Sequence, residues 1–321
     1  MKAWNTWECV LLVLLVLVLV VFGISQPGFM SADALADSTF NFSEKGLLAL
    51  AIALLIVCGE IDLSIAAILA LSSLAMGYAM RAGFGPLGIT AAALLTGMLA
   101  GAVNGVLVTR YKLPSIVVTI GTLSLYRGMA LVALGDQSIS GYPEVFSTAG
   151  NAYLGEVLGV RWLMIPIEFV FLCAFAIAVG LVLHRTVMGR RIYAIGANPV
   201  AARFSGIQAD RYRLMLFVFS GLMAAVAALL LTGRIGSTRP NIAMGWELDA
   251  ITMVILGGVA IEGGRGSMVG VMLAVLILGL FTFGLGMANV SGIVMSMIVG
   301  ILLIVAMILP AIFRSKRKLA R

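Results

Sequence analysis

The chain has 321 residues, of which 62% are hydrophobic and 11% are charged, and its mean hydropathy is +1.13. Repeated apolar runs of about 18 to 22 residues are long enough to cross a bilayer. No polar segment exceeds about 30 residues, too few to bury a core, which excludes a separate soluble domain. The formal net charge of +7 lies mostly in loops between apolar runs, a pattern typical of membrane orientation rather than of a nucleic-acid partner.

Residue types that support catalysis or metal binding are scarce. His184 is the only histidine, which argues against a Ser-His triad or a histidine-rich metal site. Cys9, Cys58 and Cys173 lie in apolar runs without paired spacing, so we expect neither a disulfide framework nor a metal site. The motif G-x-x-x-x-G-K-[ST] is absent from the sequence, so ATP does not bind here through a P-loop. We therefore expect no enzyme activity and no metal or cofactor on this chain.

The first apolar run, residues 9–24, predicts a membrane span. Lys2 before it and the small residues Gly23 and Ser25 near its end also fit a cleaved signal peptide. Because many apolar runs follow, we favour an uncleaved anchor.

An acidic interruption separates two short apolar runs, residues 46–58 and 65–80. The interruption is the segment GEIDLS at residues 59–64, which contains Glu60 and Asp62. Carboxylates next to a glycine between short apolar helices predict a broken or re-entrant segment that faces protein or water rather than lipid. A tight cytoplasmic turn between two short spans is the alternative.

Two longer apolar runs follow. Residues 87–108 carry a glycine at every fourth position, Gly97, Gly101 and Gly105, a spacing that lets another helix approach closely. Residues 113–134 predict the next span.

Arg127 lies well inside the run of residues 113–134. An arginine within a membrane span is costly unless it pairs or faces water, which makes Arg127 a candidate functional residue. Alternatively, its long side chain extends to the outer interface.

A turn-rich, acidic loop at residues 136–162 opens the second half. The remaining apolar runs are residues 163–183, 214–232, 247–261, 268–287 and 290–309. Together with the first half they predict an all-α, polytopic membrane protein with about ten transmembrane helices and a single transmembrane domain over residues 1–313. Glu247 and Asp249 open a short run much as Glu60 and Asp62 do, and paired interruptions often mark the substrate region of a transporter.

The basic residues predict the orientation of these spans. Ten crossings place both chain ends on one side, together with most of the 21 lysines and arginines. These include the arginines of residues 184–213 and a basic tail at residues 314–321. Because cytoplasmic loops are enriched in Lys and Arg, we expect both termini and the loop 184–213 in the cytoplasm.

Residues 184–213 form the longest basic segment and contain a single acid, Asp210. Asn198 is a favourable N-cap, Pro199 suits the first helical position, and Gly206 can end a helix. These residues predict a helix of about two turns within a basic loop. Such a helix suggests a surface that a cytoplasmic partner contacts, whereas an ordinary basic loop that only sets orientation is the alternative.

Several segments together resemble one family. They are residues 59–64 (family pattern G-G-I-D-L-S), residues 104–108 with 113–123 (N-G-x-L-V…P-x-x-V-T-L-G-T), residues 126–128, the loop 189–207, and residues 247–250 with the glycines at 257, 258, 263, 264 and 266. In this combination, over roughly residues 46–309, the chain resembles the permease subunits of bacterial ATP-binding-cassette importers for monosaccharides, the ribose, xylose, arabinose and galactose group. The spacing around residues 126–128 resembles the branch that imports rhamnose or the autoinducer sugar. Glu60 stands where the family pattern has glycine.

The resemblance implies a division of labour among several chains. It implies a second permease subunit, identical or different, and two ATPase subunits or one fused ATPase that bind ATP and Mg. It also implies a periplasmic or extracellular sugar-binding protein, which would contact the loops 136–162 and 233–246, and a location in the bacterial cytoplasmic (inner) membrane.

The resemblance also implies roles for residues. The residues expected to couple the chain to the ATPase are Gly189, Arg190, Ala194, Ile195, Gly196, Asn198, Pro199, Ala201, Ala202, Phe204 and Gly206. The candidate pathway residues are Glu60, Asp62, Ser64, Asn104, Thr119, Thr122, Arg127, Glu247 and Asp249. The threonines could instead bond neighbouring helices.

A proton-coupled secondary transporter is the alternative function. It would use Glu60, Asp62 and Arg127 as a relay within the membrane. Uptake driven by a pH gradient in vesicles that contain this chain alone would distinguish it from an ATP-driven importer.

Overall fold

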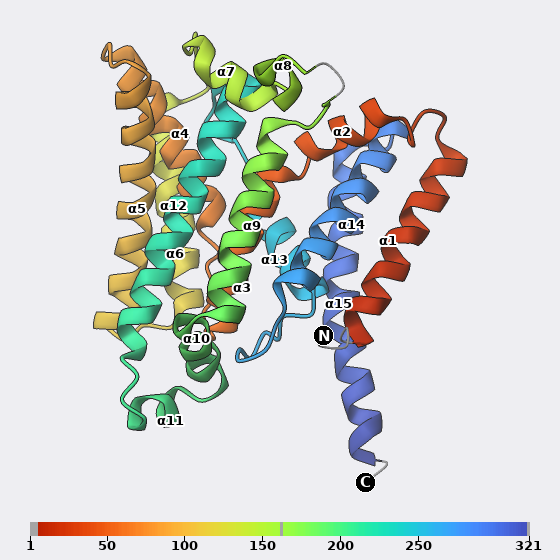
Figure 1. Ribbon diagram of the computed structural model, residues 1–321. Coiled ribbons are helices and arrows are strands. Elements are labelled where there is room, and N and C mark those ends of the chain that lie inside the picture. Colours follow the sequence, from red (N-terminus) through yellow and green to blue (C-terminus); the bar gives the residue numbers. More distant parts are fainter. Residues whose placement is uncertain (1–5, 161–162, 320–321) are drawn as a thin grey trace.

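The computed structural model describes the backbone of residues 6–160 and 163–319, and the side chains of residues 7–160 and 163–306. Within these ranges the fold is almost entirely helical, as predicted (Figure 1). The strands β1 (Ile139–Ser140) and β2 (Ser237–Thr238) form a short antiparallel pair, with Ile139 opposite Thr238.

The helices of the first half are α1 (Thr6–Ser25), α2 (Ala32–Phe40), α3 (Ser43–Val57), α4 (Ile65–Arg81), α5 (Pro86–Arg110), α6 (Ser115–Leu134), α7 (Glu144–Asn151) and α8 (Leu154–Leu158). Those of the second half are α9 (Ile167–Arg185), α10 (Val187–Ala197), α11 (Pro199–Phe204), α12 (Ala209–Ile235), α13 (Trp246–Leu256), α14 (Met268–Met287) and α15 (Gly292–Leu319).

Fewer helices than predicted are long enough to cross a membrane. In the described part of the chain, 6 helices pass by length and hydropathy, namely α1, α5, α6, α9, α12 and α14. The count reaches 7 if α2 and α3, which meet at 52°, form one bent span. The predicted count of about ten is therefore not confirmed. The difference arises because the short runs form short helices; α13, at 11 residues, is only about 16 Å long.

The helix α12 is the centre of the packing and contacts α3, α4, α5 and α7. Its contact with α5 depends on glycines. A Cβ atom on Gly97 would lie 2.3 Å from the carbonyl oxygen of Gly221, and one on Gly101 equally close to that of Phe217. On Gly105 it would lie 2.7 Å from a methyl of Leu214. The close helix approach predicted from the glycine spacing is thus confirmed.

The helix α3 runs antiparallel to α12. At its start, Glu44 lies 2.8 Å from Arg234, which is close to the end of α12. Just beyond its end, Glu60 lies 2.8 Å from Arg213, in the second turn of α12.

The helix α4 runs parallel to α12. Asp62, just before α4, accepts a hydrogen bond from Ser220, and Ser73 further along α4 bonds Thr232 at 2.7 Å. The chain therefore reverses direction at residues 58–64. This segment faces protein, as predicted, and it also turns the chain, as the alternative proposed.

The described ends of the chain lie on one side of the molecule. Figure 1 shows the start of α1 and the end of α15 toward the side that carries α10 and α11. Lys2 and the basic tail predicted at residues 314–321, which contribute to the predicted cytoplasmic orientation, have side chains outside the described residues. The orientation of this side toward the cytoplasm stays a prediction from charge.

Candidate functional site

The loop between α9 and α12 begins with a tight turn. Thr186 caps α10 by accepting a hydrogen bond from the backbone N–H of Gly189 at 3.3 Å. Gly189 itself approaches α9 so closely that a Cβ atom would lie 1.9 Å from the carbonyl oxygen of Leu183. Only glycine fits at this position. The side chain of Arg190, which follows, is exposed.

The predicted capped helix is present as α11. Asn198 Oδ1 accepts hydrogen bonds from the backbone N–H groups of Val200 and Ala201, both at 3.0 Å. Pro199 occupies the first turn, and Gly206 adopts a φ of 79° just past the end of the helix. These are the cap, start and stop that the sequence predicts.

The side chains of α11 divide into two groups. Ala202 is buried against the protein, and Ala201 is exposed. Val200 is 61% exposed and Phe204 is 90% exposed, so the apolar side chains point away from the fold. Aromatic side chains, phenylalanine among them, are enriched at protein–protein interfaces.

The end of α10 is wedged between two other segments. A Cβ atom on Gly196 would lie 1.9 Å from the carbonyl oxygen of Val57 and 2.5 Å from the backbone nitrogen of Gly264. Gly264 in turn donates a hydrogen bond to that Val57 carbonyl at 2.8 Å. Gly263 lies against Gly59, where an added Cβ atom would come within 3.0 Å. We call this cluster of Val57, Gly59, Gly196, Gly263 and Gly264 the glycine junction.

Side chains of α10 support the glycine junction. Ile192 and Ile195 are fully buried, and Ala194 is half-buried. Tyr193 donates a hydrogen bond to the carbonyl oxygen of Gly266 at 2.7 Å. Burial raises the pKa of Tyr193 to about 12, so its hydroxyl stays a donor at neutral pH. These contacts hold α10 against the end of α3 and against the connection between α13 and α14.

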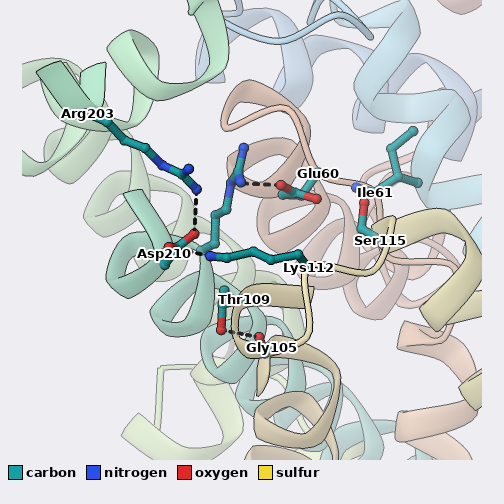
Figure 2. A network of polar contacts seen from close by, with 9 residues as sticks. Glu60, Ile61, Gly105, Thr109, Lys112, Ser115, Arg203 and Asp210 are labelled. Atoms are coloured by element: carbon teal, nitrogen blue, oxygen red, sulfur yellow. Dashed lines mark hydrogen bonds and ion pairs between the residues drawn. The ribbon is translucent and has the colours of Figure 1, made fainter. Parts of the chain in front are cut away.

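An ion-pair cluster joins the loop to the connection between α5 and α6 (Figure 2). Asp210 contacts Lys112 at 2.5 Å and Arg203 at 3.1 Å. Nearby, the backbone N–H of Ile61 donates to Ser115 Oγ at 3.2 Å. The acid that stood alone in the basic segment thus holds α11 and the α5–α6 connection together.

The helix break at residues 58–64 holds a buried polar network. Asp62 is 0% exposed and accepts hydrogen bonds from the backbone N–H of Ser64 at 2.9 Å and from its hydroxyl at 2.7 Å. Ser220 Oγ donates to the other oxygen at 2.9 Å. Asn104 donates to Ser64 Oγ at 2.7 Å. Three predicted pathway residues, Asp62, Ser64 and Asn104, are therefore brought together and enclosed by protein.

The predicted threonines bond mainly within their own helix. Thr119 donates to the carbonyl oxygen of Ser115 at 2.8 Å and lies 3.4 Å from that of Ile61. Thr122 donates to the carbonyl oxygen of Val118 at 3.1 Å. Both are buried. Apart from the long contact of Thr119 with Ile61, these hydroxyls bond no neighbouring helix, so the role of the threonines in the pathway stays a prediction.

Arg127 holds the loop that follows β2 against the first turn of α4. It donates to the carbonyl oxygens of Ile242 at 2.7 Å, Pro240 at 3.1 Å and Ala66 at 3.4 Å. The partners of Arg127 are thus backbone groups of the connection after β2 and of α4. Arg127 does not contact the network around Asp62 in the described part of the chain.

The second acidic pair does not repeat the first. Glu247 is half-buried, whereas Asp249 forms an ion pair with Lys45 at 2.5 Å. Lys45 also lies over the ring of Trp246, 5.1 Å from its centre. The pairs therefore have different partners, and their side-chain contacts reveal no internal repeat.

No cluster of three or more metal-binding side chains occurs within the described ranges. Cys9, Cys58 and Cys173 are free.

Comparison with known proteins places the chain in a family. A family described as the permease component of branched-chain amino acid transport systems matches residues 35–307. The chain belongs to this permease family. The permease is also 37% identical, over 309 residues, to the autoinducer 2 import system permease protein LsrD of Escherichia coli K12 and of Shigella flexneri. The match covers 94% of this chain and 91% of each relative.

These comparisons confirm the resemblance to permease subunits of ATP-binding-cassette importers, including its autoinducer branch. The relatives are transport components rather than enzymes, and the permease is a multi-pass membrane protein with several membrane-capable helices. No solved structure matches the chain.

Sequence reasoning missed two partners in the site. The charge pattern assigns Arg213 only to membrane orientation, yet its Nε lies 2.8 Å from Glu60 Oε1. The departure from the family glycine at Glu60 was the available signal, because a carboxylate next to a buried break requires a cationic partner. Ser220, which bonds Asp62, had no signal beyond being a small polar residue in an apolar span.

Proposed function

We propose that the permease is the transmembrane subunit of an ATP-driven, binding-protein-dependent importer of a monosaccharide. The substrate class is a pentose, a deoxyhexose such as rhamnose, or a related compound such as autoinducer 2, which appears in the name of the LsrD relatives. The observation that carries the proposal is α11, a capped helix whose Phe204 is 90% exposed. This chain has no P-loop, so the energy of ATP must reach it through a protein contact.

The assembly contains several partners. A second permease subunit and two ATPase subunits, or one fused ATPase that binds ATP and Mg, form the membrane complex. A periplasmic or extracellular binding protein delivers the sugar to loops 136–162 and 233–246. About ten helices, the short α13 among them, lie in the cytoplasmic (inner) membrane, and both termini face the cytoplasm. The asymmetry of lysines and arginines supports this orientation.

The glycine junction supports a route for the coupling movement. The ATPase contacts α11, and its closure shifts α11 together with α10. The end of α10 contacts the backbone of Val57 and Gly264, so the shift reaches the helix break and the connection between α13 and α14. Rigid backbone contact transmits such a shift better than flexible side chains do.

The comparisons name two different substrates. The family description names branched-chain amino acid transport, whereas the name of the LsrD relatives refers to autoinducer 2. Uptake of labelled sugars and of labelled leucine by vesicles that contain the complete complex would decide between them. Saturable uptake of leucine, but not of any sugar, would refute the substrate proposal.

The same vesicles test the transport class. ATP-driven uptake that requires the ATPase and the binding protein is the expected result. Uptake by this chain alone, driven by a pH gradient, would instead establish a proton-coupled carrier. The contacts of Glu60, Asp62 and Arg127 favour the first outcome, because Glu60 contacts Arg213, Asp62 contacts hydroxyls and Arg127 contacts carbonyls.

A further inference from the structure

A cavity of about 630 Å³ lies beside α11, among α10, the connection at residues 205–208 and the start of α12. Arg191, Arg211 and Tyr212 form its polar wall, and Met188 and Met215 form its apolar end. Arg191 donates a hydrogen bond to the Tyr212 hydroxyl at 2.5 Å. This hydrogen bond fixes the Arg191 guanidinium beside Tyr212. It uses one N–H group and leaves most of the other N–H groups of Arg191 available.

An apolar groove of about 610 Å³ continues from this cavity. It shares Met188 and Met215 with the cavity and is lined by apolar side chains alone. The groove runs between α9 and α12, with Leu54 of α3 at its base. Figure 1 shows both helices rising from the side that carries α10. Its lining includes Phe175, Val179 and Val182 of α9 and Val218, Phe219 and Leu222 of α12.

The two arginines of the cavity, Arg191 and Arg211, form no ion pair within the described part of the chain. The acid on this loop, Asp210, contacts Lys112 and Arg203, and Glu60 of the helix break contacts Arg213. Arg191 and Arg211 are exposed. Two unpaired guanidinium groups at one end of a hydrophobic groove match an anionic head joined to an apolar chain.

We propose that this cavity and groove together bind one anionic phospholipid. Its phosphate contacts Arg191 and Arg211, and an acyl chain lies along the groove between α9 and α12. The location fits this occupant. The groove lies on two membrane-capable helices, and the cavity lies at their end on the side richest in basic residues. Anionic headgroups concentrate at such positions on the cytoplasmic leaflet.

The lipid also has a mechanical consequence. Its headgroup would lie against Ser205, Gly206 and Ile207, which follow α11 directly. An occupied cavity restrains the link between α11 and α12. This inference does not depend on the substrate, and lipid binding can be measured without transport.

The test measures which phospholipid stays with the full-length protein. The purified permease, alone and assembled with its ATPase, is placed in nanodiscs of phosphatidylglycerol and phosphatidylcholine, and retained lipid is counted by native mass spectrometry. We expect wild type to retain phosphatidylglycerol selectively. The double variant R191Q/R211Q should retain it about tenfold more weakly, because each basic side chain at the surface strengthens such binding several-fold.

Matched variants make the test specific. R110Q/R185Q removes the same charge from exposed positions outside the cavity and should retain phosphatidylglycerol like wild type. Ala178→Trp fills the groove and should reduce retention, whereas Ala174→Trp, one turn away on α9 and outside the groove lining, should not.

Several results would overturn the proposal. These are equal retention of both lipids by wild type, loss in R110Q/R185Q as large as in R191Q/R211Q, and unchanged retention in Ala178→Trp. Loss of the lipid on assembly with the ATPase or with a second permease copy would show instead that a protein covers this surface. Ala178→Trp leaves the arginines intact, so it remains informative if R191Q/R211Q does not fold.

Discussion

Arg213 Nε lies 2.8 Å from Glu60 Oε1, with the two side chains only 18% and 8% exposed. This ion pair joins the start of α12 to the helix break that follows α3. Arg213 comes nine residues after the end of α11, so the proposed coupling helix and the break are linked through one short stretch of α12 as well as through the glycine junction.

Removing the carboxylate of Glu60 should destabilise the fold. Glu60→Gln leaves the Arg213 charge largely buried without its partner, at a cost of about 3 kcal/mol in the free energy of unfolding. Thermal unfolding of the detergent-solubilised protein measures this effect. The double variant E60Q/R213Q should lose less than the sum of the two single variants, because it removes both charges.

An exposed ion pair provides the control. Lys112 and Asp210 are 54% and 41% exposed, so Lys112→Gln should cost less than about 1 kcal/mol. Equal effects of Glu60→Gln and Lys112→Gln would contradict the importance assigned to burial.

Adding a methyl group at Gly196 should disrupt the glycine junction. In Gly196→Ala the new Cβ atom would overlap the Val57 carbonyl, so α10 must move away from α3 and from the connection between α13 and α14. We expect a lower unfolding temperature and loss of ATP-driven uptake in the reconstituted complex. Gly300→Ala is the matched control, because no atom lies within 4 Å of the added methyl group. Full uptake by Gly196→Ala would show that the junction is not needed for coupling.

Charge on α11 should uncouple ATP hydrolysis from transport. Ala201 and Phe204 are exposed, so Ala201→Asp with Phe204→Asp should leave the protein inserted but prevent its contact with the ATPase. Uptake should be lost and the ATPase should no longer respond to the loaded binding protein. Phe204→Leu keeps an apolar contact and should retain most of the uptake. Wild-type uptake by the double aspartate variant would remove α11 from the coupling role.

Asp62 should act through its hydrogen bonds rather than through a transported proton. Asp62→Asn keeps an acceptor for Ser64 and should preserve ATP-driven uptake, whereas Asp62→Ala leaves buried donors unsatisfied and should cost about 2 kcal/mol. Unfolding and uptake assays on both variants check this. Complete loss of uptake in a stable Asp62→Asn protein would favour a proton-coupled mechanism.

Arg127 should control the mobility of the loop after β2. Arg127→Met removes the donors to the Pro240 and Ile242 carbonyls, so backbone amides of residues 241–245 should exchange hydrogen faster. Arg239→Met is the control, since the Arg239 side chain is exposed and belongs to the same loop. Unchanged exchange in Arg127→Met would leave Arg127 free for a direct role in the pathway.

Local chemistry made several features predictable. Asn198, Pro199 and Gly206 specify the cap, start and stop of α11 through interactions within a few residues. The spacing of Gly97 and Gly101 predicts a close helix contact because it depends only on helical periodicity. The membrane class follows from hydropathy alone, which needs no knowledge of the fold.

The number of spans was less predictable. Hydropathy cannot distinguish a short apolar helix that ends inside the protein from a helix that crosses the bilayer. The helices α3, α4 and α13 are short and apolar, so hydropathy counts their runs as spans. Their ends are set by backbone contacts with distant segments, as between Val57 and Gly264.

The sequence by itself therefore determined the helical membrane class, the family and the capped helix α11. Only the tertiary structure decided the partners of the polar residues. Glu60 contacts Arg213, Asp62 contacts Ser220, and Gly196 contacts Val57, and each pair is separated by more than a hundred residues. Sequence periodicity reports on neighbours within one helix, whereas these contacts depend on which helices pack around α12.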